Sequence, residues 1–252
     1  MLEFKNVSAS CGRTPILEQV SVSFPKGIIT VLIGPNGCGK TTLLQCLNGT
    51  SRVTSGEIYL EGQDYLKLSL KERARKISFL PQIRTIIPAI PARMLVEHGR
   101  FPYLGFSRKK TKEDDRIVEN ALSFTHTASY ANQPVDTLSG GIRQRVFFAM
   151  ALAQDCDYLV LDEPATYLDP DGQREFLSMA RELKGQGKTV ILTLHNLSHA
   201  ISLADRLIIM NDRRVIAQDV PKKCLDDHII QDIFHVSCKQ FKDKDGTYYF
   251  FQ

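Results

Sequence analysis

The sequence has 252 residues, of which 43% are hydrophobic and 24% are charged. This is the composition of an ordinary globular protein, and it excludes a disordered or fibrous chain. The formal charge of +4 is too small to indicate nucleic-acid binding. No apolar stretch reaches the roughly 18–20 residues of a membrane-spanning helix. The six cysteines include no CxxC pair, so we expect reduced thiols and neither a disulfide framework nor a zinc site.

The first third of the chain combines short strands with turns. Apolar residues alternate in two predicted strands, Met1–Val7 and Ser21–Phe24, which a turn at Gly12–Pro15 separates. The next strand, Gly27–Ile33, ends in a continuous apolar run, as expected for a buried parallel strand. We then expect a helix over Thr41–Asn48 and a hairpin strand over Ser55–Leu60. A further strand, Ile77–Leu80, is predicted to end at Pro81.

The remainder of the chain alternates helices and strands. Residues 84–155 are helical in pattern and include a charged stretch, 107–116, that we interpret as a solvated face. We then expect three buried strands, Tyr158–Leu161, Thr189–Leu194 and Arg206–Met210, with a helix over 172–184 between the first two. The tail is predicted to contain a helix, Leu225–Phe234, and a hairpin with its turn at Asp245-Gly246. Buried strands that alternate with helices predict a parallel α/β sheet, here with a helical insertion.

A glycine-rich turn lies between the strand Gly27–Ile33 and the helix that follows it. Its residues fit the pattern G-x-x-x-x-G-K-[ST]: Gly34, Pro35, Asn36, Gly37, Cys38, Gly39, Lys40 and Thr41. Glycines let backbone N–H groups curl around phosphate oxygens, and the helix N-terminus adds partial positive charge. Lys40 can reach the β- and γ-phosphates, and the Thr41 hydroxyl can bind Mg²⁺. The turn predicts a nucleoside triphosphate site and leaves kinase, GTPase and ATPase open.

Two acidic residues directly follow the strand Tyr158–Leu161. An acid at the carboxyl end of a buried strand lies where an open α/β sheet binds its ligand. Asp162 would orient Mg²⁺ through water, and Glu163 can polarise an attacking water as a general base. Two adjacent acids with distinct roles favour hydrolysis over transfer to a bound acceptor.

A third motif, Leu138-Ser139-Gly140-Gly141-Ile142-Arg143-Gln144-Arg145, precedes an apolar helix over 146–153. With that helix, it resembles the signature sequence of ABC-type ATPases. The phosphate loop and the two acids are also motifs of this family, and the resemblance covers almost the whole chain. Three more motifs of that family occur in the expected places. They are Gln82 after a strand, Asp169 in the stretch 167–170, and His195 after the strand Thr189–Leu194.

The resemblance implies an α/β fold, in which a P-loop NTPase (RecA-like) core carries an antiparallel β subdomain and an inserted α-helical subdomain. Residues 1–252 would form a single ABC ATPase domain. The nucleotide-binding core would take residues 1–83 and 156–220, and the helical subdomain with the signature motif would take 84–155. Residues 221–252 would form a short C-terminal helix and hairpin.

The resemblance also implies roles for single residues. ATP contacts beyond the loop would come from Thr42 and Asp162. The catalytic residues would be Glu163, His195 and Gln82, with His195 in contact with the γ-phosphate. The Mg²⁺ ligands would be Thr41, Gln82 and, through water, Asp162.

Two copies of such a domain pair head to tail in this family. Ser139, Gly140 and Gly141 of one copy would close over ATP held by Lys40 of the other, and Asp169 would couple the two sites. The chain would therefore be a homodimer that serves separately encoded integral membrane permease subunits and, indirectly, a substrate-binding protein. It would be a peripheral protein at the cytoplasmic face of the cell membrane, and no nucleic-acid partner is expected.

A segment of the helical part bears on the transported substrate. Gly99-Arg100-Phe101-Pro102-Tyr103 resembles the ATP-binding subunits of importers for iron(III)-siderophores, haem and cobalamin, as does the short tail after residue 220. The groove beside Gln82 would receive a cytoplasmic helix of the permease. Alternatives stay open: a plain turn at residues 99–103, the same ATPase serving a manganese, zinc or lipid transporter, or a soluble ABC ATPase that acts on DNA or ribosomes.

Two positions depart from the family pattern. Ile142 stands where the signature usually has glutamine, but Ser139 and Gly141 are intact, so we expect hydrolysis to survive. Cys11 stands where the family usually has an aromatic ring that stacks on adenine.

The loss of that ring removes a stacking contact of about 1–2 kcal/mol. We therefore expect weak or poorly base-selective nucleotide binding, and we expect Cys11→Tyr to strengthen ATP binding relative to GTP. Equilibrium titration of both nucleotides against both proteins measures this. An unchanged ratio of ATP to GTP affinity in the variant contradicts the interpretation.

Overall fold

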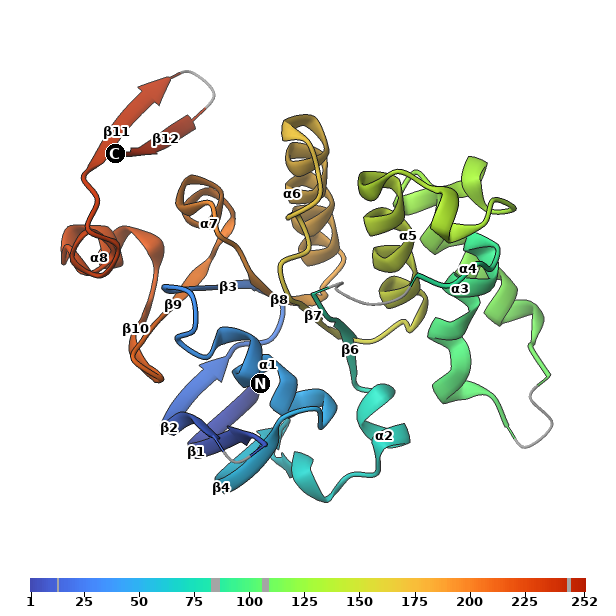
Figure 1. The fold of residues 1–252 in the computed structure, drawn as a ribbon, viewed down its shortest axis with the longest axis horizontal. Helices are drawn as coiled ribbons and strands as arrows, with labels where there is room; N and C mark the ends of the chain where they lie inside the picture. Colours follow the sequence, from blue (N-terminus) through green and yellow to red (C-terminus); the bar gives the residue numbers. More distant parts are fainter. Residues whose placement is uncertain (13, 83–86, 106–108, 244–245) are drawn as a thin grey trace. The chain divides into compact units, whose positions relative to one another are not determined.

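The computed structural model describes residues 1–12, 14–82, 87–105, 109–243 and 246–252. Figure 1 shows the elements in chain order. The described chain forms two units, one of residues 1–68 and 189–252 and the other of residues 69–188. Within these ranges, every helix is too short or too polar to cross a membrane.

An antiparallel sheet forms the N-terminal part of the first unit, in the strand order β2-β1-β4-β5. Its strands are β1 (Leu2–Cys11), β2 (Thr14–Phe24), β4 (Arg52–Leu60) and β5 (Gln63–Asp64). The sequence predicted β1 and β2 too short, because register shifts after Phe4 and Val7 interrupt the alternation that marks a regular strand. The predicted hairpin is confirmed, and its turn places Glu61 and Gly62 at positive φ.

The second set of strands in this unit runs in the order β10-β9-β3-β8. They are β3 (Ile29–Ile33), β8 (Thr189–Thr193), β9 (Arg206–Asn211) and β10 (Arg214–Asp219). β3 pairs in parallel with both β8 and β9, and every residue of β3 and β8 is buried. The continuous apolar runs of the sequence thus belong to buried parallel strands, as predicted.

The helices of the first unit are short. They comprise α1 (Lys40–Asn48), η1 (Tyr65–Lys67), α7 (Leu197–Leu203), α8 (Pro221–Asp226) and α9 (Ile229–Phe234). The tail was predicted as one helix over residues 225–234, but the chain leaves the helical conformation at His228, whose φ is 57°. The predicted hairpin consists of β11 (Cys238–Asp243) and β12 (Gly246–Phe251), with Asp245 of the predicted turn outside the described residues.

The second unit contains one parallel strand pair, β6 (Ile77–Leu80) and β7 (Tyr158–Leu161). The sequence predicted both strands with these bounds. Two helices of this unit accompany them, α2 (Leu70–Ala74) and α6 (Pro170–Gly185). α6 begins two residues earlier than predicted, because Asp169 caps it and Pro170 is tolerated in its first turn.

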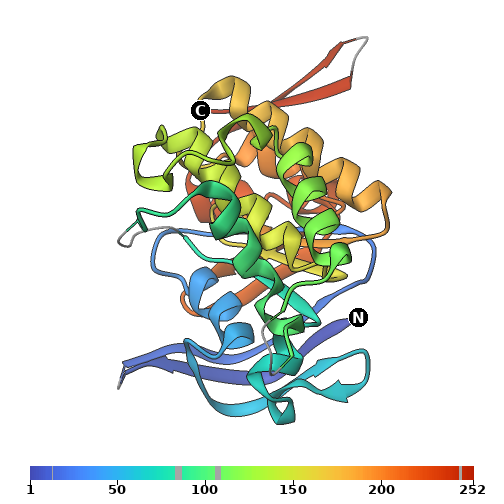
Figure 2. The same ribbon diagram turned by 90° about the vertical axis from the view of Figure 1, so that its right-hand side faces the viewer.

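Three further helices of the second unit pack side by side, in green to yellow in Figure 2. They are α3 (Ala92–Glu97), α4 (Lys112–Phe124) and α5 (Gly140–Ala153), with the 3₁₀ turns η2 (His98–Tyr103), η3 (Ala128–Tyr130) and η4 (Val135–Thr137) between them. Their shared core is apolar and includes Val96, Leu122 and Val146, all fully buried. The predicted helical character of this part of the chain is confirmed. Residues 107 and 108 of the charged stretch lie outside the described residues.

The segment Gly99–Tyr103 is the 3₁₀ turn η2, and a buried ion pair anchors it. Arg100 Nε donates to Asp114 Oδ1 at 2.9 Å, with the two side chains only 7% and 8% exposed. Arg100 also donates to the Ala153 carbonyl at 2.9 Å and lies over the Tyr103 ring. Burial alone would raise the pKa of Asp114, but hydrogen bonds from Thr111 and Arg100 hold that pKa below its ordinary value. The segment is therefore a fixed structure rather than a loose turn.

Removal of the cation should destabilise the protein. In Arg100→Leu the Asp114 carboxylate is left buried and unpaired, so we expect the free energy of unfolding at pH 7 to fall by about 3–5 kcal/mol. The loss should shrink as the pH drops through the titration of Asp114, because the protonated carboxyl carries no charge. Urea unfolding at several pH values measures both effects.

Arg116→Leu is the matched control, because Arg116 forms an exposed pair with Glu113 on the same helix as Asp114. Its expected cost is much smaller, because solvent screens an exposed ion pair. Equal losses in the two variants contradict a special role for the buried pair.

Candidate functional site

The predicted phosphate loop lies in the first unit, between the end of β3 at Ile33 and the start of α1 at Lys40. A Cβ at Gly34 would come within 2.2 Å of the Met210 carbonyl oxygen, so only glycine fits there. Gly39, at φ 105°, starts α1 in a conformation that other residues rarely adopt. These two glycines let the chain turn back tightly onto the first turn of the helix.

Lys40 is held inside this loop. Its Nζ donates to the carbonyl oxygens of Gly34 at 2.8 Å and Pro35 at 3.0 Å, and it lies 3.9 Å from the buried Cys38 Sγ. The side chain is only 6% exposed. Thr41 and Thr42 follow it and are partly exposed, and Asn36 and Gly37 are exposed at the tip of the loop. A buried cation beside the N-terminus of α1 is an arrangement that attracts an anion such as a phosphate.

His195 lies at the same edge of its sheet as the phosphate loop. In the parallel pair β3 and β8, Leu32 is opposite Thr193. Gly34 follows Leu32 by two residues and His195 follows Thr193 by two residues, so both lie beyond the same end of the strand pair. His195 is exposed there, and Asn196 after it caps α7 by accepting from His199 N. The first unit thus brings together two of the predicted motifs.

The second unit brings together Gln82 and the two acids in the same way. Leu80 is opposite Leu161 in the pair β6 and β7, so Gln82 and Glu163 lie at one edge. The Gln82 amide donates to Glu163 Oε2, and Thr166 Oγ1 donates to the same oxygen at 3.3 Å. Glu163 has a φ of 51°, which is uncommon for a residue with a side chain. Asp162 is buried beside it.

The signature motif forms the N-terminus of α5, also in the second unit. Ser139 caps the helix, and its hydroxyl accepts from the Ile142 N–H at 3.4 Å. This contact uses the backbone of residue 142, so the change from glutamine to isoleucine does not remove it. Gly140 and Gly141 occupy the first turn, and a Cβ at Gly141 would lie 3.6 Å from Leu168.

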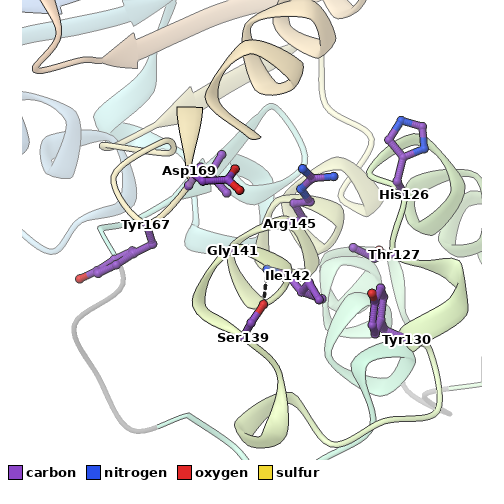
Figure 3. Close-up of a pocket in the computed structure, with 10 residues that line it drawn as sticks. His126, Thr127, Tyr130, Ser139, Gly141, Ile142, Arg145, Tyr167 and Asp169 are labelled. Carbon is purple, nitrogen blue, oxygen red and sulfur yellow. Dashed lines mark hydrogen bonds between the residues drawn. The ribbon is translucent and has the colours of Figure 1, made fainter. Parts of the chain in front are cut away.

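The signature motif and Asp169 both line a pocket of about 380 Å³ (Figure 3). Asp169 caps α6 by accepting from Gly172 N at 2.8 Å. The other lining residues come from three segments: His126, Thr127, Tyr130, Ser139, Gly141, Ile142, Arg145, Tyr167 and Leu168. A predicted signature residue and the predicted coupling residue therefore face one pocket.

Sequence reasoning missed several polar side chains at these sites. Gln144 is buried and donates to the Pro164 carbonyl at 2.9 Å, which ties α5 to the loop after Glu163. Thr166 contacts Glu163, and Glu175 contacts both Arg145 and His126. Gln144 and Arg145 belong to the signature motif, and no sequence pattern marks Thr166 or Glu175. The contacts of all four residues could not be predicted, because each contact joins segments that only the fold brings together.

Comparisons with known proteins identify the family. The ABC transporter family model matches residues 17–166. The petrobactin import ATP-binding protein FpuD of Bacillus anthracis is 38% identical over 94% of this chain and 88% of its own length. The iron(3+)-hydroxamate import ATP-binding protein FhuC of Bacillus subtilis is 37% identical over 96% of this chain and 90% of its own length. The hemin import ATP-binding protein HmuV of Rhodococcus jostii is 33% identical over 92% of this chain and 79% of its own length.

Solved structures agree in fold. A chain of a metal-chelate type ABC transporter in an inward-facing conformation has a TM-score of 0.85 and 26% identity, covering 100% of this chain and 96% of that one. The dimeric ATP-binding cassette MJ0796, bound to ADP and phosphate after hydrolysis, has a TM-score of 0.78 and 28% identity, covering 88% and 99%. The predicted P-loop NTPase core with an antiparallel β subdomain and a helical subdomain is confirmed. The chain belongs to the ABC transporter family and is an ATP-binding, ATP-hydrolysing subunit of that family.

Proposed function

We propose that this ATPase energises an importer of iron-siderophore, haem or cobalamin chelates. Three relatives serve the import of petrobactin, iron(3+)-hydroxamate and hemin, and they support this substrate class. The fixed structure of Gly99–Tyr103, with Phe101 57% exposed beside the buried Arg100, supports a surface that meets a partner. The partner would be an integral membrane permease, which this chain would meet as a peripheral protein at the cytoplasmic face of the membrane. A substrate-binding protein would be an indirect partner.

The contact between Gln82 and Glu163 carries the proposed mechanism. The two residues are 81 positions apart, yet the Gln82 amide donates to the carboxylate of the proposed general base. Glu163 would take a proton from the attacking water, and Gln82 and Thr166 would hold its carboxylate in one orientation. His195 would contact the γ-phosphate and keep Glu163 and the water in line.

The remaining roles concern ATP and its metal ion. The phosphate loop would hold the phosphates through backbone N–H groups and Lys40. The hydroxyl of Thr41 and the amide oxygen of Gln82 would bind Mg²⁺ directly, and the carboxylate of Asp162 would act through water. All three supply hard oxygen atoms of the kind that Mg²⁺ prefers, so their chemistry fits the ion. Bound Mg²⁺ would neutralise charge that develops on the transferred phosphoryl group.

A second copy of the chain completes the proposed site. Ser139, Gly140 and Gly141 of one copy would contact the γ-phosphate held by the other through the N-terminus of α5. Asp169, which lines the same pocket as Ser139, would couple the two sites. The dimeric form of MJ0796 supports a homodimer.

Loss of the general base should abolish turnover and leave ATP binding intact. Glu163→Gln keeps the shape of the side chain but cannot accept the proton, so we expect kcat to fall about 10²- to 10⁴-fold. Glu182→Gln, an exposed change on α6, is the control and should retain the wild-type rate. Phosphate release and equilibrium ATP binding are measured for each protein. A Glu163→Gln variant with wild-type kcat contradicts the assignment.

Reconstitution with the permease tests the substrate class. In proteoliposomes, we expect a binding protein loaded with an iron chelate, haem or cobalamin to stimulate ATP hydrolysis. The same binding protein without its ligand is the control. Stimulation only by manganese- or zinc-loaded binding proteins points to another transporter class, and the absence of stimulation by any of them argues against import.

A further inference from the structure

Glu175 on α6 joins two other helical segments beside the pocket between Ser139 and Asp169. Its Oε2 lies 2.5 Å from Nη2 of Arg145 on α5, and its Oε1 lies 3.2 Å from Nε2 of His126 after α4. The three side chains thus link the end of α4, the signature helix and the helix that Asp169 caps. His126 and Arg145 both line the pocket, as Figure 3 shows.

Arg145 crosses from the signature helix to the first turns of α6. A Cβ at Gly172 would lie at an ordinary contact distance of 3.5 Å from Arg145 Nη2, so the guanidinium reaches the first turn of α6. The Arg145 side chain is 25% exposed and that of Glu175 is 35% exposed. This partial burial strengthens a charged pair relative to one in open solvent.

His126 is held in an uncommon backbone conformation. Its φ is 55°, and the threonines on both sides are fully buried, with their hydroxyl oxygens 2.9 Å apart. Thr125 and Thr127 also donate to carbonyls of the last turn of α4. The end of α4 is therefore fixed, and so is the backbone from which the imidazole reaches Glu175.

Two residues that line the pocket cap different helices. Ser139 is the capping residue of α5, and Asp169 is the capping residue of α6. The contact between Arg145 on α5 and Glu175 on α6 joins the same two helices that these residues cap.

We propose that Glu175 is a positioning residue that sets the spacing between the signature motif and Asp169. The inference rests on the proposed function, in which both segments meet a second copy of the chain at the same time. Glu175 contacts neither ATP nor the reacting atoms in this scheme. It acts through Arg145, with His126 as a second partner of the same carboxylate.

The first test is the isosteric change Glu175→Gln in the full chain. We expect kcat for ATP hydrolysis to fall about 10- to 100-fold, because small misplacements of positioning groups have effects of this size. We expect an unchanged KM for ATP, since the phosphate loop lies on other elements, and a melting temperature close to that of the control Glu182→Gln. A wild-type kcat, or a loss of kcat that merely follows a loss of folded protein, overturns the proposal.

The second test exchanges the two charges. Arg145→Glu alone should lower kcat, and the double change Arg145→Glu with Glu175→Arg should restore much of the lost turnover, because the ion pair is rebuilt in reverse. A folded double variant that is no faster than the single variants overturns the proposal. His126→Gly should have a smaller effect than Glu175→Gln, because it leaves the pair with Arg145; an equal or larger effect overturns Arg145 as the main partner.

A third measurement separates this proposal from the proposed function. In the Glu163→Gln background, ATP-dependent dimer formation is followed by light scattering with and without Glu175→Gln. We expect the added change to weaken dimer formation while ATP binding by the monomer persists. Equal dimer formation overturns the role of Glu175, whereas a wild-type chain that neither hydrolyses ATP nor dimerises with it overturns the proposed function itself.

Discussion

The register of parallel strands is the constraint on which the functional loops depend. Neighbouring parallel strands end at the same edge, so the loops that leave them gather without any direct attraction between their side chains. Pairing of Leu32 with Thr193 brings the phosphate loop and His195 to one edge in the first unit. Pairing of Leu80 with Leu161 does the same for Gln82 and Glu163 in the second. A slip of one residue in either pair would separate these groups.

Polar ties then fix the helices of the second unit. Apolar packing among α3, α4 and α5 is non-directional and tolerates small rotations. Directional contacts remove that freedom: Arg100 holds η2 to Asp114 and to the end of α5, and Gln144 holds α5 to the Pro164 carbonyl. Such contacts are costly to leave half-made, which favours a single arrangement of the helices.

The parts of the fold that the sequence predicted are those in which a local pattern decides the outcome. The strands β3, β7 and β8 were found because continuous apolar runs mark strands buried on both faces. β10 was missed, since its burial alternates between partly buried and exposed residues and its run is short. At the site, the glycines and Lys40 follow from backbone geometry within eight residues. Glu175 and Thr166 could not be found, because their partners are set by tertiary packing.

The burial of the Lys40 ammonium has a consequence for the free energy of phosphate binding. The ammonium is already withdrawn from water. The hydrogen-bond partners that the structure describes for it are dipoles of the loop, namely two carbonyl oxygens and a weak sulfur contact. The cost of dehydrating this charge is therefore met when the loop folds and is not repeated when an anion arrives. A bound phosphate would add the full negative charge that the carbonyl dipoles beside Lys40 do not carry. Nucleotide binding and the stability of the first unit are thereby linked through one buried amine.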